Sequence, residues 1–172
     1  GAGVQAIGGR SGNQASQHVE PSARFGADED PGPSHSRVDL DGILLTHEHQ
    51  DHTGGLEVLS RGRALPLFCT ALTQEHLLGS LTFRTPPAWR LMQTGSAFDF
   101  RDLRIESFPV PHDAVDPVGY VLGTEGARLG ILSDVGFVTN LIKDRLRGSD
   151  TLFVEANYDT QLLDADTKRP WA

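Results

Sequence analysis

The chain has 172 residues, with 15 Lys or Arg against 23 Asp or Glu, and its formal net charge is −8 at pH 7. These values fit one globular domain over residues 1–172 and exclude disordered and collagen-like chains, and the negative charge argues against a broad cationic surface for nucleic acid. The single cysteine, Cys69, excludes an intrachain disulfide, and no apolar run approaches the ~20 residues that span a bilayer, so we expect a cytoplasmic protein with no membrane partner.

The expected elements begin after residue 37. Residues 1–37 carry few structure signals, and they fit a flexible surface segment as well as a structured part of the domain. Ile43, Leu44 and Leu45 then form a continuous apolar run, which predicts a strand buried on both faces. The elements expected next are a short helix at 54–59, a strand at 64–69, and a helix at 73–78 with Thr73 as its N-cap.

A two-residue period begins at residue 97. Phe98 and Phe100 alternate with charged residues, and the alternation resumes after Asp102, so we predict a hairpin with its turn at Asp102. The remaining expected elements are strands at 118–122 and 129–132, a helix at 138–146 with Thr139 near its start, and a strand at 152–154. Strands with interposed helices indicate an α/β (α+β) protein, layered around mixed sheets.

A histidine-rich segment follows the first expected strand directly. Within the six residues 47–52, four side chains are of metal-ligand type: His47, His49, Asp51 and His52. In an extended backbone His47 and His49 point the same way and can bind one cation. Asp51 and His52 can serve a second cation if the chain turns at 53–55. Imidazole suits zinc, copper, iron and nickel, and carboxylate also admits manganese, so the segment indicates a metal site more strongly than a polar loop.

Two further candidates each follow a predicted strand. His112 comes after the apolar residues 108–111, and Asp134 comes after the strand at 129–132. Either residue alone is a plausible turn residue. Because strand ends hold convergent side chains in fixed directions, both become expected ligands beside the histidine-rich segment.

In order and separation, the histidine-rich segment, the later histidine and the later aspartate resemble the metallo-β-lactamase superfamily of binuclear metallohydrolases. Residues 109–120 are similar to the histidine motif of its YycJ (WalJ) branch, and residues 133–136 and 153–159 are similar to later motifs of that branch. The resemblance covers residues 38–160. It implies an αββα sandwich with the metal ions at one edge.

The resemblance also implies a ligand set for two divalent ions, with zinc favoured and manganese suitable. The first ion would be bound by His47, His49 and His112. The second would be bound by Asp51 and His52, with Asp134 bridging the two ions. Asp51 would also act catalytically by orienting the attacking water, while Asp113 would either hold an imidazole or serve as an ordinary turn residue.

The chain departs from the family pattern towards both ends. Only residues 14–21 separate Asn13 from Ser22-Ala23-Arg24, which is too short for the first strand and turn of the family. The family has a last histidine ligand, and no histidine follows His112 in this sequence. We therefore expect a sandwich that is incomplete at the N-terminal strand and at the C-terminus, with an under-liganded second metal position.

Two adjacent cations activate a shared water and stabilise the attacking and leaving oxygens of a displacement. The resemblance implies a phosphodiesterase or nuclease, of the DNA 5′–3′ exonuclease kind, with DNA or RNA as substrate and no nucleotide cofactor. Two alternatives stay open. One is hydrolysis of a thioester, a β-lactam or a small cyclic phosphate, and the other is a catalytically idle metal-binding domain.

Overall fold

A computed structural model of the chain describes residues 4–7, 40–62 and 64–155, and the side chains of 40–62 and 64–155. In chain order the elements are β1 (Val4–Ile7), β2 (Gly42–Leu45), α1 (Gln50–Thr53), α2 (Leu56–Ser60), β3 (Pro66–Thr70), α3 (Ala71–Ser80), β4 (Ala88–Met92), β5 (Ala97–Phe100), β6 (Leu103–Pro109), β7 (Val118–Gly123), β8 (Arg128–Leu132), α4 (Asn140–Leu146) and β9 (Thr151–Val154).

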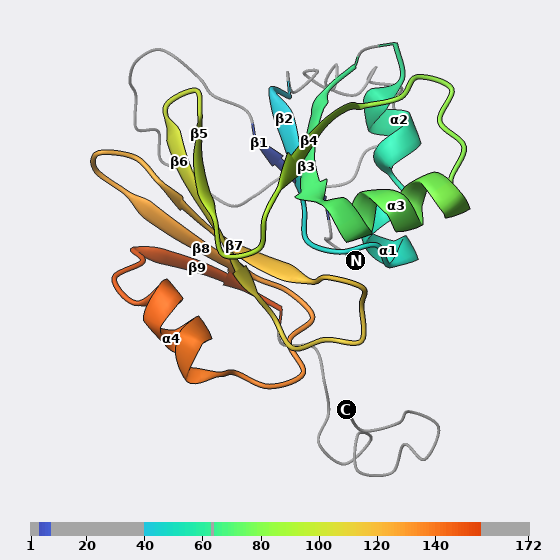
Figure 1. The fold of residues 1–172 in the computed structure, drawn as a ribbon. Helices are drawn as coiled ribbons and strands as arrows, with labels where there is room; N and C mark the ends of the chain where they lie inside the picture. The colour runs from blue at the N-terminus through green and yellow to red at the C-terminus, as the bar shows by residue number, and fades with distance from the viewer. Residues whose placement is uncertain (1–3, 8–39, 63, 156–172) are drawn as a thin grey trace, which may run out of the picture.

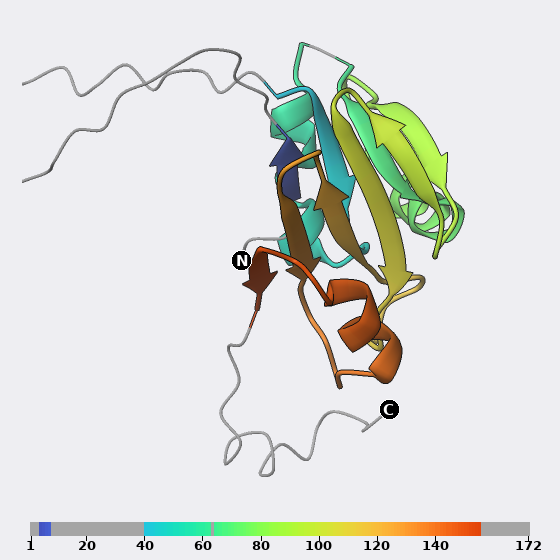
Figure 2. The same cartoon turned by 90° about the vertical axis from the view of Figure 1, so that its left-hand side faces the viewer.

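The strands form two mixed sheets (Figure 1). The first has the order β1-β2-β3-β4, with β1 antiparallel to β2 and the other pairs parallel. The second has the order β5-β6-β7-β8-β9, antiparallel throughout except for the parallel pair β8–β9. In the view of Figure 2, the outer strands β1 and β9 lie on the side opposite β4 and β5.

The inner core lies between the two sheets. Leu44 of β2 and Phe68 of β3 pack there against Tyr120 of β7, and all three are buried. Because successive side chains of a strand point to opposite faces, Ile43 and Leu45 face away from this core. The continuous apolar run at 43–45 is thus explained by a strand covered on both faces, as predicted.

The helices cover the outer faces of the sheets (Figure 1). Leu56 of α2 and Leu77 of α3 pack with Ile43 on the outer face of the first sheet. Ile142 of α4 packs with Val121 of β7 on the outer face of the second. The layers therefore run helix, sheet, sheet, helix, and the expected αββα sandwich is confirmed.

Most expected elements are present. The strand at 43–45, the hairpin β5–β6 with its turn at 101–102, the strands β7, β8 and β9, and helix α4 are confirmed. Thr139 is the N-cap of α4, and its side chain accepts a hydrogen bond from the amide of Ile142. Asn13, residues 22–24 and the part of the 153–159 motif from residue 156 onward lie outside the described residues.

The expected cap of α3 is wrong by three residues. Its N-cap is Thr70, whose hydroxyl accepts a hydrogen bond from the Thr73 amide. Strand β3 runs to Thr70 and the helix begins at the next residue, so Thr73 lies already inside the first turn. Two strands were also not expected, namely β4 and, in the segment with few structure signals, β1.

No helix within the described ranges is both long and apolar enough to cross a bilayer.

Two hydrogen bonds connect the end of β2 to β7 in the other sheet. The hydroxyl of Tyr120 donates to the carbonyl oxygen of Leu45 at 2.6 Å, and the amide of Val118 donates to the carbonyl oxygen of Thr46 at 3.0 Å. Tyr120 is completely buried, and burial raises the pKa of its phenol well above the ordinary value. Burial thus favours the protonated phenol, which is the form that donates this hydrogen bond.

We expect Tyr120→Phe to lower the free energy of unfolding by about 1–2 kcal/mol, because it keeps the ring but removes a buried hydrogen bond. Denaturant titration of both proteins measures this. An unfolding midpoint and slope equal to those of the unchanged chain would contradict the role given to the hydroxyl.

Candidate metal centre

Three strands end at one edge of the sandwich. Strands β6 and β8 both run antiparallel to β7, so their carboxyl ends lie at the same edge of the second sheet. The amide of Val118, at the start of β7, binds the carbonyl oxygen of Thr46 just after β2. The segments that follow β2, β6 and β8 therefore meet, and they carry the histidine-rich segment, His112 and Asp134.

The first ligand group consists of three imidazoles. The ligand atoms of His47, His49 and His112 lie within 4.8 Å of one another. His112 Nε2 lies 3.1 Å from His49 Nδ1, although 63 residues separate the two in the chain. Three imidazole nitrogens converging on one point form the usual donor set of a zinc site.

The second ligand group shares one imidazole with the first. The ligand atoms of His47, His52 and Asp134 also lie within 4.8 Å of one another. Asp134 Oδ2 lies 3.4 Å from His47 Nε2 and contacts His52 Nε2 as well. The carboxylate of Asp134 thus lies beside the imidazoles of both groups, where the resemblance implies a bridging ligand.

Two oxygen atoms contact the far sides of three of these imidazoles, those of His47, His52 and His112. Thr46 Oγ1 lies 3.1 Å from His47 Nδ1 and 3.5 Å from His52 Nδ1. Asp113 Oδ1 lies 3.0 Å from His112 Nδ1. A hydrogen carried on each Nδ1 would be donated to these oxygens, which leaves the Nε2 lone pairs directed at the cluster.

The environment of His47 favours the neutral imidazole that a metal requires. His47 is 1% exposed, and its Nε2 forms no hydrogen bond within the part of the chain that the structure describes. Burial, together with the nearby His52, His112 and His49, lowers the pKa of His47 to about 3. A buried imidazole nitrogen without a hydrogen bond, facing other ligand-type atoms, fits a bound cation.

The expected site residues are brought together to different degrees. His47, His49, His52, His112 and Asp134 form the two groups. Asp51 belongs to neither group. Its side chain is 64% exposed, and its Oδ2 lies 3.4 Å from His52 Nε2. Thr46 was not expected at the site, because a hydroxyl at a strand end is too common to indicate a contact with two imidazoles.

Asp134 has an unusual backbone conformation. Its φ is +45°, in the left-handed region that residues other than glycine seldom adopt. The next turn of chain is held by a hydrogen bond of 2.7 Å from the amide of Gly136 to the carbonyl oxygen of Pro111, the residue before His112. The segments that carry Asp134 and His112 are therefore fixed to each other.

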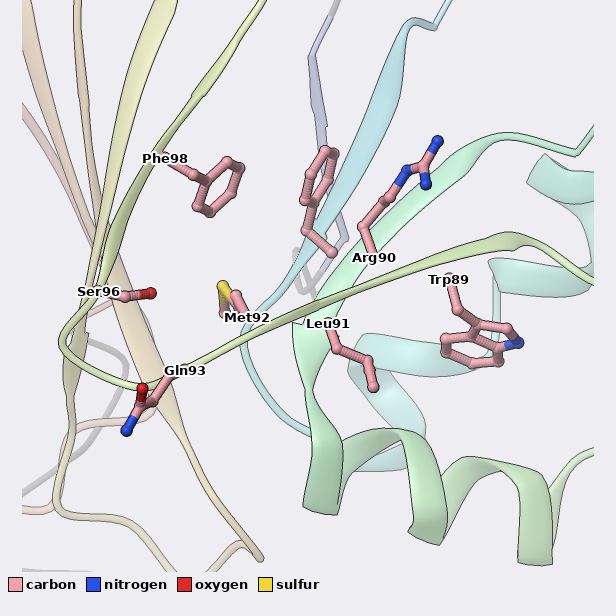
Figure 3. A pocket seen from close by; sticks show the side chains of 8 residues that line it. Trp89, Arg90, Leu91, Met92, Gln93, Ser96 and Phe98 are labelled. Atoms are coloured by element: carbon pink, nitrogen blue, oxygen red, sulfur yellow. The ribbon is translucent and has the colours of Figure 1, made fainter.

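A separate hollow of about 520 Å³ lies at the edge strands β4 and β5 (Figure 3). Its lining residues are Phe68, Trp89, Arg90, Leu91, Met92, Gln93, Ser96 and Phe98. None of them belongs to either ligand group. Trp89 packs edge-to-face on Phe83, with ring centroids 5.8 Å apart, and so serves as an anchor for the segment before β4.

The sequence matches a known family over most of its length. Residues 19–166 match the model of the Beta-lactamase superfamily domain. The chain belongs to the metallo-β-lactamase superfamily. Members of this superfamily bind divalent metals such as zinc, in agreement with the clustered imidazoles and carboxylate.

Curated relatives agree with the YycJ branch of the superfamily. Exodeoxyribonuclease YycJ of Bacillus anthracis is 34% identical over 137 residues, which are 78% of this chain and 50% of that protein. Exodeoxyribonuclease WalJ of Streptococcus pneumoniae serotype 2 is 33% identical over 127 residues, 73% of this chain and 47% of that protein. The chain thus spans about half the length of these relatives.

Solved structures agree on the fold of the superfamily. The Zn²⁺-bound PqqB from Methylobacterium extorquens superposes with a TM-score of 0.62 at 22% sequence identity, over 71% of this chain and 48% of that one. This similarity shows that the chain has the fold of the superfamily, which the resemblance implied.

We expect added zinc to raise the unfolding midpoint of the metal-free protein, because a ligand that binds only the folded state stabilises it by mass action. His112→Ala should reduce this rise strongly, since it removes one of the three imidazoles of the first group. His76→Ala, which removes an exposed histidine of α3, is the matched control and should leave the rise unchanged. Thermal unfolding at increasing zinc concentration measures all three, and an equal rise in all three proteins would contradict the assignment of His112.

Proposed function

We propose that this chain carries the metal centre of a phosphodiesterase that hydrolyses nucleic acid, with two divalent ions, zinc or manganese. The single observation that carries the proposal is that two ligand groups at one edge share His47, with the carboxylate of Asp134 beside both. Under this proposal His47, His49 and His112 hold one ion. Asp51 and His52 hold the other, and Asp134 lies between them.

When bound, such an ion pair supplies a Lewis acid and lowers the pKa of a water molecule towards neutrality. The protein's own residues orient the ligands and the water. Asp113 and Thr46 contact Nδ1 of His112, His47 and His52, and the second oxygen of the exposed Asp51 carboxylate would accept a hydrogen bond from the attacking water. His47 lies on the buried side of the cluster, where burial lowers its pKa to about 3 and keeps this imidazole neutral.

The choice of a phosphodiester rests on the relatives. The two curated relatives at 33–34% identity are named exodeoxyribonucleases, which supports DNA as the substrate, with RNA as the alternative polymer. The 5′–3′ polarity rests on the family resemblance. A net charge of −8 is compatible with an anionic substrate, because bound cations neutralise the non-bridging phosphate oxygens locally. The proposal also includes two earlier predictions. Residues 1–172 form one domain, and the protein is cytoplasmic.

The decisive experiment compares substrates after loading with zinc or manganese. We expect turnover of bis(4-nitrophenyl) phosphate and shortening of end-labelled DNA, and neither with His49→Ala, which removes a ligand of the first group. His76→Ala serves as the control and should retain full activity. Elemental analysis of the same samples should find two metal ions per chain, whereas one ion would indicate an under-liganded second position.

Other outcomes would replace the proposal. Turnover of a thioester, a β-lactam or a cyclic phosphate, without turnover of the diester, would assign a different hydrolase. Bound metal without turnover of any substrate would identify an idle metal-binding domain.

A further inference from the structure

Glu48 lies between two expected ligands, and its carboxylate is buried. The residue is 8% exposed. Its Oε1 accepts a hydrogen bond of 2.8 Å from the backbone amide of Val115, which lies 67 residues further along the chain and three residues after His112. Its Oε2 is also buried and has no hydrogen-bond partner among the residues that the structure describes.

The segment that receives this contact has no regular structure of its own. No helix or strand is present between β6 and β7, over residues 110–117. The two ends of the segment are joined by a hydrogen bond from the amide of Val110 to the carbonyl oxygen of Pro117. From the side of β4 and β5, the Thr94 hydroxyl donates to Asp116. The hydrogen bond from Val115 to Glu48 holds the middle of the segment 110–117. Glu48 belongs to the histidine-rich segment, so this bond joins the two segments directly.

A buried carboxylate is costly to keep in this position. Desolvation of a charged group opposes burial unless the group is fully hydrogen-bonded, and here one oxygen has no partner within the described residues. An apolar side chain would fill the same space without that cost. A carboxylate at this position is therefore best explained by a need for its acceptor oxygen, which binds the Val115 amide.

We propose that Glu48 is a positioning residue that sets the location of His112 relative to His47 and His49, by binding the Val115 amide through Oε1. The backbone of Glu48 lies between His47 and His49, so its carboxylate is attached to the same stretch of chain as those two imidazoles. Its hydrogen bond connects them to the chain three residues beyond His112. This inference rests on the metal centre proposed above and adds the contact that aligns the ligands from distant parts of the chain.

The contact can be tested first without metal. In the metal-free protein, hydrogen exchange measured by NMR should show the Val115 amide protected. Protection should be lost in Glu48→Ala and kept in Glu48→Gln, because the amide of glutamine retains an acceptor oxygen at Oε1. Glu125→Ala, which removes an exposed glutamate from the turn between β7 and β8, is the matched control and should change nothing. An unprotected Val115 amide in the unchanged chain overturns the proposal without any variant.

Zinc affinity, measured by competition with a chelator, provides the second test. We expect Glu48→Ala to weaken binding by about 10–100-fold, the range for residues that orient metal ligands. Glu48→Gln should bind zinc like the unchanged chain. Equal weakening in both variants overturns the proposal, because it would make the charge, and not the acceptor oxygen, the determinant. Normal affinity in both also overturns it.

A double-mutant cycle separates positioning of His112 from general loosening of the fold. Because Glu48 is proposed to act through His112, Glu48→Ala should have no further effect on zinc affinity when His112→Ala is already present. A further loss in the double variant overturns the proposal. Failure of this proposal can be distinguished from failure of the metal centre. An unchanged chain that binds no zinc refutes the proposed function, whereas hydrogen exchange still tests the contact between Glu48 and Val115 in that chain.

Discussion

The amide of Val118 and the hydroxyl of Tyr120 both bind carbonyl oxygens at the end of β2, and in doing so they join the two sheets at the point where the histidine-rich segment begins. A sandwich held only by apolar contacts tolerates small shifts between its sheets, since such contacts have no direction. Hydrogen bonds have a fixed length and direction. These two therefore set the register between the sheets, and the convergence of imidazoles from β2 and β6 depends on it.

Around the cluster, polar atoms are arranged in successive layers. In the innermost layer the imidazoles face one another and the carboxylate of Asp134. Behind them, Thr46 and Asp113 contact Nδ1 atoms of these rings. In the outermost layer, Glu48 binds the backbone amide of Val115, beyond His112. Each layer fixes the direction of the one inside it. Precise ligand geometry in this fold is thus a property of the surrounding hydrogen bonds as much as of the ligands themselves.

Local patterns were sufficient to predict much of this structure. The apolar run at 43–45 and the alternation around Asp102 each depend on neighbours in the chain, and both are present as expected. Within the histidine-rich segment, His47, His49 and His52 lie in the two ligand groups and Asp51 lies in neither. Strand β4 was missed because it follows two prolines and its residues, Ala88–Met92, alternate only weakly between apolar and polar. The cap of α3 was misplaced because two threonines three residues apart offer the same signal.

Contacts between distant segments were beyond such patterns. Nothing near Glu48 indicates that its carboxylate binds the amide of Val115, and nothing near Thr46 indicates that its hydroxyl faces two rings, because both partners are chosen by the packing of the sheets. The residue types at those positions are compatible with many surface roles. Only the assembled sandwich distinguishes them.

The left-handed backbone at Asp134 restricts which residues evolution or design can place there. Glycine would adopt that conformation most easily, but it has no side-chain oxygen that could contact the imidazoles. Glutamate would keep a carboxylate, but it would place that carboxylate one carbon further from the backbone, and it seldom adopts a positive φ. Asparagine tolerates the same φ and has nearly the same shape. Exchange of aspartate for asparagine therefore removes a single negative charge with little change in conformation, which makes this position a direct means of separating electrostatics from geometry.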